Sequence, residues 1–202
     1  MNDLVFYHNS LNLNELIQTA KSLNTKTIIL AKNFHSIKEA EELKKKLASF
    51  KFDFKLCHLM LSSNSKQLSQ FKNKTDFVAV LGGNVELNKF AVSSKQIDFL
   101  LAPVTFGRLS VDTAIARIAA ENEKIVIFLF SDFLNSFGLK RMQLFRNAFF
   151  SMKLFKKFKV SASIFSGAEY SDELRAVEDL SVFLELLGLN EKQARKIIKG
   201  QK

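Results

Sequence analysis

The sequence predicts an α/β protein in which the strands of a parallel sheet alternate with helices. Short runs of apolar, β-branched or aromatic residues alternate with amphipathic stretches along the chain, which is typical of helices that surround a parallel sheet. The 202 residues are 47% hydrophobic and 25% charged, the usage of a chain that folds. One proline and seven glycines leave few positions for irregular loops, so we expect dense secondary structure.

Side-chain caps support several of the predicted helix starts. Ser36 with Glu39 three residues later is a capping box, and Asn12 and Asn190 offer similar caps, while Gly188 supplies a left-handed stop before the last helix. In chain order the strand candidates are residues 4–7, 27–30, 52–56, 77–81, 97–100, 125–130 and 161–165. The helix candidates are residues 14–23, 37–50, 66–71, 85–91, 111–122, 139–157, 172–187 and 191–199.

Regular alternation without a long linker favours a TIM-barrel-like (β/α) barrel over an open doubly wound sheet. With seven strands the barrel is incomplete or irregular, unless a short eighth strand lies near Leu134. Residues 191–199 form an extra C-terminal helix beyond the alternation. We expect residues 1–202 to form a single domain, since domains usually hold about 100 to 200 residues.

Several classes of protein are disfavoured by composition. The longest apolar run, residues 125–130, is far shorter than the roughly 20 residues of a membrane-spanning helix, and the N-terminus has no signal-peptide pattern. The sequence therefore predicts a soluble cytoplasmic protein without a membrane partner. The lone cysteine, Cys57, can form neither an internal disulfide nor a zinc site by itself.

The net charge of +10, from 30 basic and 20 acidic residues, favours a polyanionic partner such as RNA or DNA. A lysine-rich solvated surface is the alternative explanation. All six arginines lie at or beyond Arg108. Because guanidinium groups bind phosphates bidentately, we expect the specific contacts in the second half of the chain.

Residues 140–159 hold seven basic residues and no acidic one. On a helix, Arg146, Lys153 and Lys157 cluster on one side with Phe149 among them, a pattern that suits a nucleic acid. The alternative is a solvated face on which Phe149 packs under lysine stems. The predicted inward stripe consists of Leu144, Phe145, Ala148, Met152 and Phe155.

Two glycine-containing turns follow predicted strands, where backbone amides could receive a phosphate. Gly82 and Gly83 precede a helix, and Ser166 and Gly167 follow the last strand. A tight turn that needs small residues explains these positions equally well.

The three histidines, His8, His35 and His58, include no His-x-His pair of the kind that catalytic metals often use. Cys57 and His58 are consecutive in a strand, so their side chains point to opposite faces and cannot form a nucleophile and its base. We therefore expect neither a catalytic residue nor a metal site on this chain.

The order and spacing of many residues beyond position 82 resemble the ribonuclease P protein component 3 family, the archaeal and eukaryotic subunit with a TIM-barrel-like fold. The match is dense over residues 82–200 and thin before them. Its residues are Gly82-Gly83, Asn88-Lys89-Phe90-Ala91-Val92, Ile97-Asp98-Phe99-Leu100, Pro103, Ala116, Ala119, Asn122, Ser131, Leu134, Arg141, Asn147, Ser166-Gly167-Ala168, Leu174-Arg175, Asp179 and Leu187-Gly188.

The resemblance implies a noncatalytic subunit of ribonuclease P, the endonuclease that removes the 5′ leader from precursor tRNA. It implies that magnesium ions on the catalytic RNA perform the hydrolysis, with no cofactor on this chain, and that the partners are ribonuclease P RNA, precursor tRNA and the component 2 subunit. Its phosphate ligands are expected to be Lys89, where the family usually has arginine, together with Arg108, Arg141, Arg146 and Arg175.

Two other functions are weighed against this one. A metal-dependent barrel phosphoesterase is disfavoured because the histidines are dispersed. A small-molecule-binding barrel that uses the two glycine turns leaves the net charge without a role, and fold alone does not choose among the three.

Overall fold

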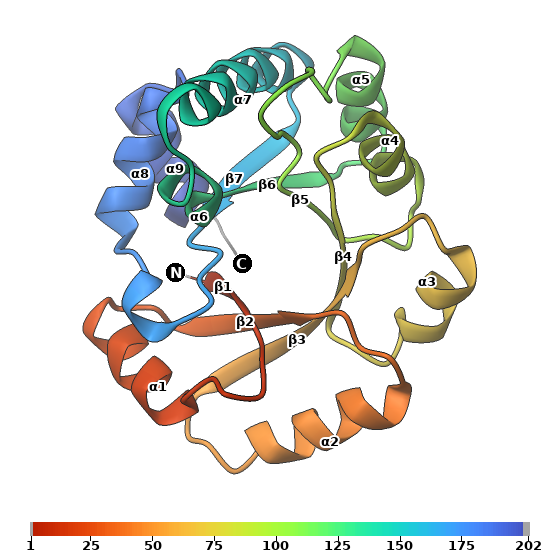
Figure 1. The fold of residues 1–202 in the computed structure, drawn as a ribbon, viewed down its shortest axis with the longest axis vertical. Helices are drawn as coiled ribbons and strands as arrows, with labels where there is room; N and C mark the ends of the chain where they lie inside the picture. The colour runs from red at the N-terminus through yellow and green to blue at the C-terminus, as the bar shows by residue number, and fades with distance from the viewer. Residues whose placement is uncertain (1, 200–202) are drawn as a thin grey trace.

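In the computed structural model, which describes residues 2–199, seven parallel strands form a nearly closed barrel surrounded by helices (Figure 1). Each strand pairs with its neighbours in sequence, in the order β1 to β7. All seven predicted strands are present, with shifted ends at five of them. Their bounds are β1 Asn2–Phe6, β2 Thr27–Lys32, β3 Asp53–Met60, β4 Phe77–Leu81, β5 Phe99–Leu101, β6 Ile125–Leu129 and β7 Ser161–Phe165.

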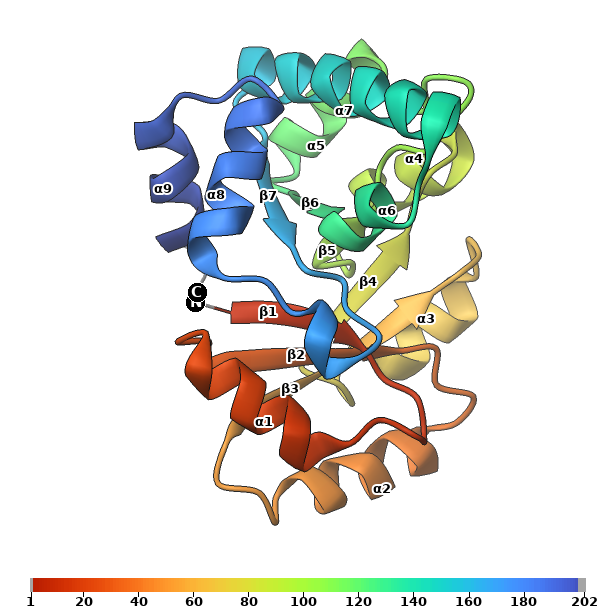
Figure 2. The same cartoon turned by 60° about the vertical axis from the view of Figure 1, so that its left-hand side comes forward.

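The helices also follow the predicted order. They are α1 Leu13–Ser22, α2 Ile37–Leu47, α3 Ser65–Phe71, α4 Val85–Ser93, α5 Thr113–Glu121, α6 Phe130–Leu134, α7 Gly138–Phe158, α8 Val177–Leu186 and α9 Glu191–Lys199, with a 3-10 turn, η1, over Ser171–Glu173. The extra C-terminal helix is thus confirmed. It lies beside α8, as Figure 2 shows.

Two local predictions are wrong. The segment near Leu134 is the helix α6 and not an eighth strand, and the helix predicted over residues 172–187 is divided into η1 and α8. Only one of the two hydrogen bonds of the predicted capping box at α2 is present. The Glu39 amide donates to the Ser36 hydroxyl at 3.2 Å, but the Glu39 carboxylate accepts from the amide of His35, one residue before the cap, at 2.9 Å.

Alternate residues of each strand face the barrel interior, as the period of two in a strand requires. Leu4, Ile29, Phe99, Ile127 and Phe165 belong to this interior cluster. The intervening residues face the helices and form two further clusters, one with α1 and α2 and one with α4, α5 and α7 to α9.

A side chain joins the first and last strands. Asp3 on β1 is fully buried, and its Oδ1 accepts a hydrogen bond from the Ser166 amide at 2.7 Å while its Oδ2 accepts one from the Ser166 hydroxyl. The Phe6 amide adds a bond to the Ala168 carbonyl at 2.8 Å. These contacts join β1 to the segment after β7, while β1 and β7 themselves are not paired with each other. Among residues 2–199, no helix is long and apolar enough to cross a membrane.

Candidate nucleic-acid interface

The helix α7 presents the largest basic surface predicted from the sequence. It is 21 residues long, about 30 Å at 1.5 Å per residue. Its predicted inward stripe is confirmed, because Leu144, Ala148, Met152 and Phe155 are buried and Phe145 packs against the core. Three cationic side chains, Arg146, Lys153 and Lys157, are exposed on the other side, and the sequence holds no acidic residue from position 133 to 168.

Phe149 lies among these cations but also contacts the protein. Its side chain is 39% exposed, and a Cβ atom added to Gly188 would come within 3.0 Å of its ring. The Lys153 ammonium lies 4.6 Å from the ring centroid, a cation–π distance. The ring therefore packs against the turn between α8 and α9 and under a lysine, as in the alternative interpretation, and an RNA contact by Phe149 stays a prediction.

The loop after β5 brings Arg108 to α7. The side-chain amide of Asn147, buried on α7, donates to the carbonyls of Thr105 and Gly107 at 2.9 and 3.2 Å. Lys140 adds a cation–π contact, with its ammonium 5.0 Å from the Phe106 ring centroid. Arg108 is exposed and follows Gly107 directly, so this tethered loop carries a cation next to α7.

A second buried asparagine, Asn88 on α4, fixes the other side of the same loop. It donates to the carbonyls of Pro103 and Ser110 at 2.7 and 2.8 Å and accepts a bond from the Gly83 amide at 3.2 Å. The positioning roles of Asn88 and Asn147 were not predicted. Both belong to the residues that carry the family resemblance, which is the one signal in the sequence that could have indicated them.

Arg141 and Arg175 do not join the α7 face as exposed cations. The Arg141 guanidinium donates to the carbonyls of Ser136 and Leu134, where α6 ends. The Arg175 guanidinium donates to the carbonyls of Asp172 and Leu174 at 2.9 Å each. Both side chains therefore stabilise local turns, and phosphate contacts by them remain predictions.

Lys89 is exposed on α4, and α5 lies between α4 and α7 around the barrel (Figure 1). The structure therefore separates Lys89 from the basic face of α7 by one helix. Of the predicted cationic ligands, Arg108, Arg146, Lys153 and Lys157 are the exposed ones on α7 or on the loop tethered to it.

The two glycine turns serve packing. The Gly82 amide donates to the Leu101 carbonyl at 2.8 Å, the Gly83 amide donates to Asn88, and a Cβ atom at Gly82 would overlap the Asn88 carboxamide. Ser166 is buried, and its amide and hydroxyl both donate to Asp3. A Cβ atom at Gly167 would lie 2.7 Å from the Ser131 hydroxyl.

These contacts favour the tight-turn interpretation. The amides of Gly82, Gly83 and Ser166 already donate hydrogen bonds within the chain, so they do not point freely at a ligand. A phosphate contact at either turn stays a prediction without support from this geometry.

The candidate metal ligands lie in separate surroundings. The His8 ring nitrogens contact the Ser10 hydroxyl at 2.8 Å and the Glu169 carbonyl at 2.9 Å. His58 is fully buried against Phe71, with ring centroids 3.8 Å apart, and burial lowers its pKa to about 4. Over residues 2–199 there is no group of three His, Cys, Asp or Glu side chains that could hold a metal ion.

Comparison with known proteins gives one consistent family. The sequence matches the model of the family described as RNase P subunit p30 over residues 5–201. The Ribonuclease P protein component 3 of Methanosarcina barkeri is 28% identical over 131 residues, 65% of this chain and 55% of the relative. The protein of that name from Methanocaldococcus jannaschii is 31% identical over 156 residues, 73% of this chain and 66% of the relative. The matched part of this chain thus spans between 55% and 66% of these relatives.

A solved structure agrees with the sequence matches. A chain in the cryo-EM structure of archaeal Ribonuclease P with mature tRNA is 26% identical and has a TM-score of 0.82, covering 98% of this chain and 87% of that chain. A chain of an uncharacterized protein, at 10% identity and a TM-score of 0.60, is similar in fold alone.

Proposed function

This chain belongs to the family of RNase P subunit p30, and on that premise we propose that it is a protein subunit of ribonuclease P. The ribonucleoprotein removes the 5′ leader from precursor tRNA, and this subunit binds and organises the catalytic RNA. The observation that carries the proposal is the similarity, over nearly the whole chain, to a chain of an archaeal Ribonuclease P structure that also contains mature tRNA.

The exposed cations on and beside α7 are the RNA ligands in this proposal. Arg108, Arg146, Lys153 and Lys157 neutralise phosphates, with no acidic residue of α7 to repel the RNA. Folded RNA is recognised largely through its shape, phosphates and 2′-hydroxyls, so these contacts need not read bases. The role of the subunit is to hold the RNA in its active shape.

The hydrolysis itself belongs to the RNA in this proposal. Magnesium ions bound to the RNA supply the chemistry, and this chain requires no cofactor of its own. We assign the function to one domain over residues 1–202, working in the cytoplasm. Residues 1 and 200–202 of that domain lie outside the described part.

An apolar end of α7 suits the protein partner, the component 2 subunit. Phe137, Leu139 and Met142 are 72%, 73% and 59% exposed around the start of the helix. Leu139 and Met142 have no ring that could stack on a base, whereas a protein surface can bury them together with Phe137. The basic surroundings, including Lys140, favour a partner whose apolar recess is bordered by carboxylates.

Reconstitution tests the proposal. Cleavage of a precursor tRNA by the ribonuclease P RNA is measured at low magnesium with the partner proteins, with and without this chain. We expect the chain to accelerate cleavage, and the Lys153→Ala/Lys157→Ala double variant to do so less well than Lys21→Ala, a control on α1. A particle that is equally active without this chain would contradict the proposal.

The component 2 contact has its own measurement. Leu139→Ser/Met142→Ser should weaken binding of purified component 2 in calorimetry while leaving the RNA affinity of the isolated chain unchanged. If the double variant instead loses RNA affinity and binds component 2 normally, the apolar end of α7 belongs to the RNA interface.

A further inference from the structure

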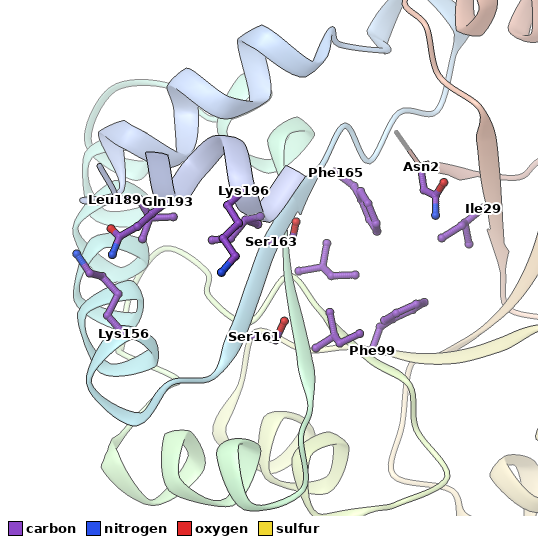
Figure 3. A pocket seen from close by; sticks show the side chains of 13 residues that line it. Asn2, Ile29, Phe99, Lys156, Ser161, Ser163, Phe165, Leu189, Gln193 and Lys196 are labelled. Atoms are coloured by element: carbon purple, nitrogen blue, oxygen red, sulfur yellow. The ribbon is translucent and has the colours of Figure 1, made fainter. Parts of the chain in front are cut away.

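A cavity opens at the amino-terminal ends of the strands, at the opposite end of the barrel from the glycine turns and beside the last turn of α7, from which Lys156 lines it. Its volume is about 590 Å³, within the roughly 300–1,000 Å³ that small-ligand sites occupy. Its inner wall consists of barrel-interior side chains, among them Ile29, Phe99 and Phe165 (Figure 3). Ile127 belongs to the same wall. The cavity therefore reaches into the barrel itself.

Small side chains on β7 leave room for the cavity. Residues 161, 163 and 165 all line the cavity, and two of these three positions are serines, whose side chains are much smaller than the Phe99 and Ile127 side chains of the neighbouring strands. The helix α9 packs against β7 and borders the opening with Gln193 and Lys196. The extra C-terminal helix thus forms one wall of the cavity.

The wall combines aromatic rings with hydrogen-bonding groups. Phe99 and Phe165 offer apolar rings, while Asn2 offers a side-chain amide and Ser161 a hydroxyl (Figure 3). Gln193 lies farther out on α9, where its Oε1 accepts a hydrogen bond from the Asn190 amide at 3.2 Å. A planar heterocycle matches the rings with its faces and the Asn2 amide with its edge, whereas an aliphatic chain makes no hydrogen bond to that amide.

The opening is cationic. The Lys196 side chain is exposed at the rim, and the Lys156 ammonium is held nearby by a 2.9 Å hydrogen bond to the Gly188 carbonyl. No acidic side chain is among the described residues that line the cavity. A ligand that carries its negative charge at one end of an aromatic body is complementary to this arrangement.

We propose that this cavity binds a nucleotide, with the base inside the barrel end and the phosphate at Lys196. The nucleotide has two sources with the same chemistry: a free mononucleotide, or an unpaired nucleotide of an RNA strand turned out of its stack. The inference goes beyond the proposed subunit function and does not depend on it.

Calorimetry of the full chain tests the site with three probes: AMP, ribose 5-phosphate and dodecanoate. We expect AMP to bind at least tenfold more tightly than ribose 5-phosphate, which lacks the base, and than dodecanoate, which lacks a polar edge. Tighter binding of dodecanoate, or no heat with millimolar AMP, would overturn the proposal.

Two variants locate the binding. Ser161→Phe fills the opening and should weaken AMP at least tenfold. Lys196→Ala should weaken AMP three- to tenfold and leave adenosine unchanged, while Lys192→Ala, also exposed on α9 but outside the cavity, should change neither. Because Lys196 is exposed, its variant should fold even if Ser161→Phe does not. Equal losses from the two lysine variants would mean diffuse charge and overturn the site.

Competition separates the two sources. If AMP displaces a single-stranded RNA oligonucleotide from the wild type and not from the Ser161→Phe variant, the site takes a nucleotide of RNA. If AMP binds but displaces no RNA, the site takes a free nucleotide. The Arg146→Ala/Lys153→Ala variant tests the two sites separately. If it loses RNA affinity and keeps AMP affinity, RNA binding by α7 and nucleotide binding by the cavity are independent.

Discussion

Asp3 has a structural role, although burying its carboxylate costs free energy of desolvation. Desolvation raises the pKa of its carboxyl to about 6, against the hydrogen bonds from Ser166 and Leu4 that favour the charged form. The Ser166 hydroxyl in turn accepts a bond from the Arg175 amide at 2.9 Å. One carboxylate thus organises the junction between β1 and the segment after β7.

Replacing Asp3 by alanine should destabilise the protein strongly. The Ser166 and Leu4 amides would lose their acceptor, at about 1–3 kcal/mol for each unsatisfied buried group. Urea unfolding measures the effect, with Glu121→Ala, an exposed acid on α5, as the control. Similar midpoints for the two variants would show that Asp3 does not hold the barrel closed.

His58 should make the protein sensitive to acid. Its folded-state pKa of about 4 lies below the ordinary 6.5, so the unfolded chain takes up the proton first as the pH falls. Its contribution to the free energy of unfolding is complete above pH 6.5 and declines as the pH falls from about 6.5 to about 4, by roughly 1.4 kcal/mol for each pKa unit. Unfolding measured between pH 7 and pH 4 should show a smaller decline in His58→Phe. An equal decline in wild type and variant would contradict this cause.

At the scale of elements, α7 joins packing to charge. One side completes the core, and the other carries cations with no carboxylate to neutralise them. Asn147 links this helix to the loop after β5, so helix and loop act as one surface.

The charge of α7 should appear in the salt dependence of RNA binding. Arg146→Ala/Lys153→Ala should reduce the slope of log affinity against log salt by roughly 0.7–0.9 for each phosphate that the variant no longer neutralises. Lys21→Ala and Lys26→Ala, in the first half of the chain, serve as controls in the same titration. Equal slope changes in both pairs would indicate a diffuse charge effect.

Asn147→Ala should weaken RNA binding without removing a charge. Freeing the carbonyls of Thr105 and Gly107 releases the loop that carries Arg108, so the affinity should fall about as far as in Arg108→Ala. A filter-binding titration of the two variants decides this. An Asn147→Ala variant with wild-type affinity would show that Arg108 needs no fixed loop.

At the scale of the whole molecule, the two ends of the barrel differ. The carboxyl ends of the strands hold two smaller cavities, of about 360 and 370 Å³, beside Gly82 and Gly167. The amino ends hold the larger cavity of about 590 Å³, which has a cationic rim. The proposed nucleotide site thus lies at the opposite end of the barrel from the site of the usual barrel enzyme.

The isolated chain should cleave no RNA, because residues 2–199 bring together no three His, Cys, Asp or Glu side chains that could hold a catalytic metal ion. Purified protein is incubated with a precursor tRNA and manganese, zinc or magnesium, and we expect intact substrate. Cleavage that requires a metal and is abolished by His8→Ala would favour the phosphoesterase alternative.

The sequence alone determined the elements and the family. Strands and helices are encoded by local periodicity, so residues 77–81 and 161–165 were predicted to the residue, and the family resemblance lay in ordered residues such as Asn88 and Asn147. The sequence did not indicate α6, because its first residue, Phe130, belongs to the apolar run of β6 and only four helical residues follow. A pattern that short carries no period of its own.

Only the tertiary structure decided which side chains are engaged within the chain and which are available to contact a ligand. Asp3 and Ser166 are 163 residues apart, and nothing local in the sequence indicates that one accepts from the other. Arg141 and Arg175 differ, because the carbonyls that accept their hydrogen bonds lie within seven residues in the sequence. Their basic character predicted phosphate contacts, and only the folded turns show that the chain's own carbonyls accept from them. The cavity, too, depends on side chains from several strands and α9 meeting at one end of the barrel. Periodicity reports a residue's own element, whereas burial, closure and cavities depend on contacts that form only when distant segments pack.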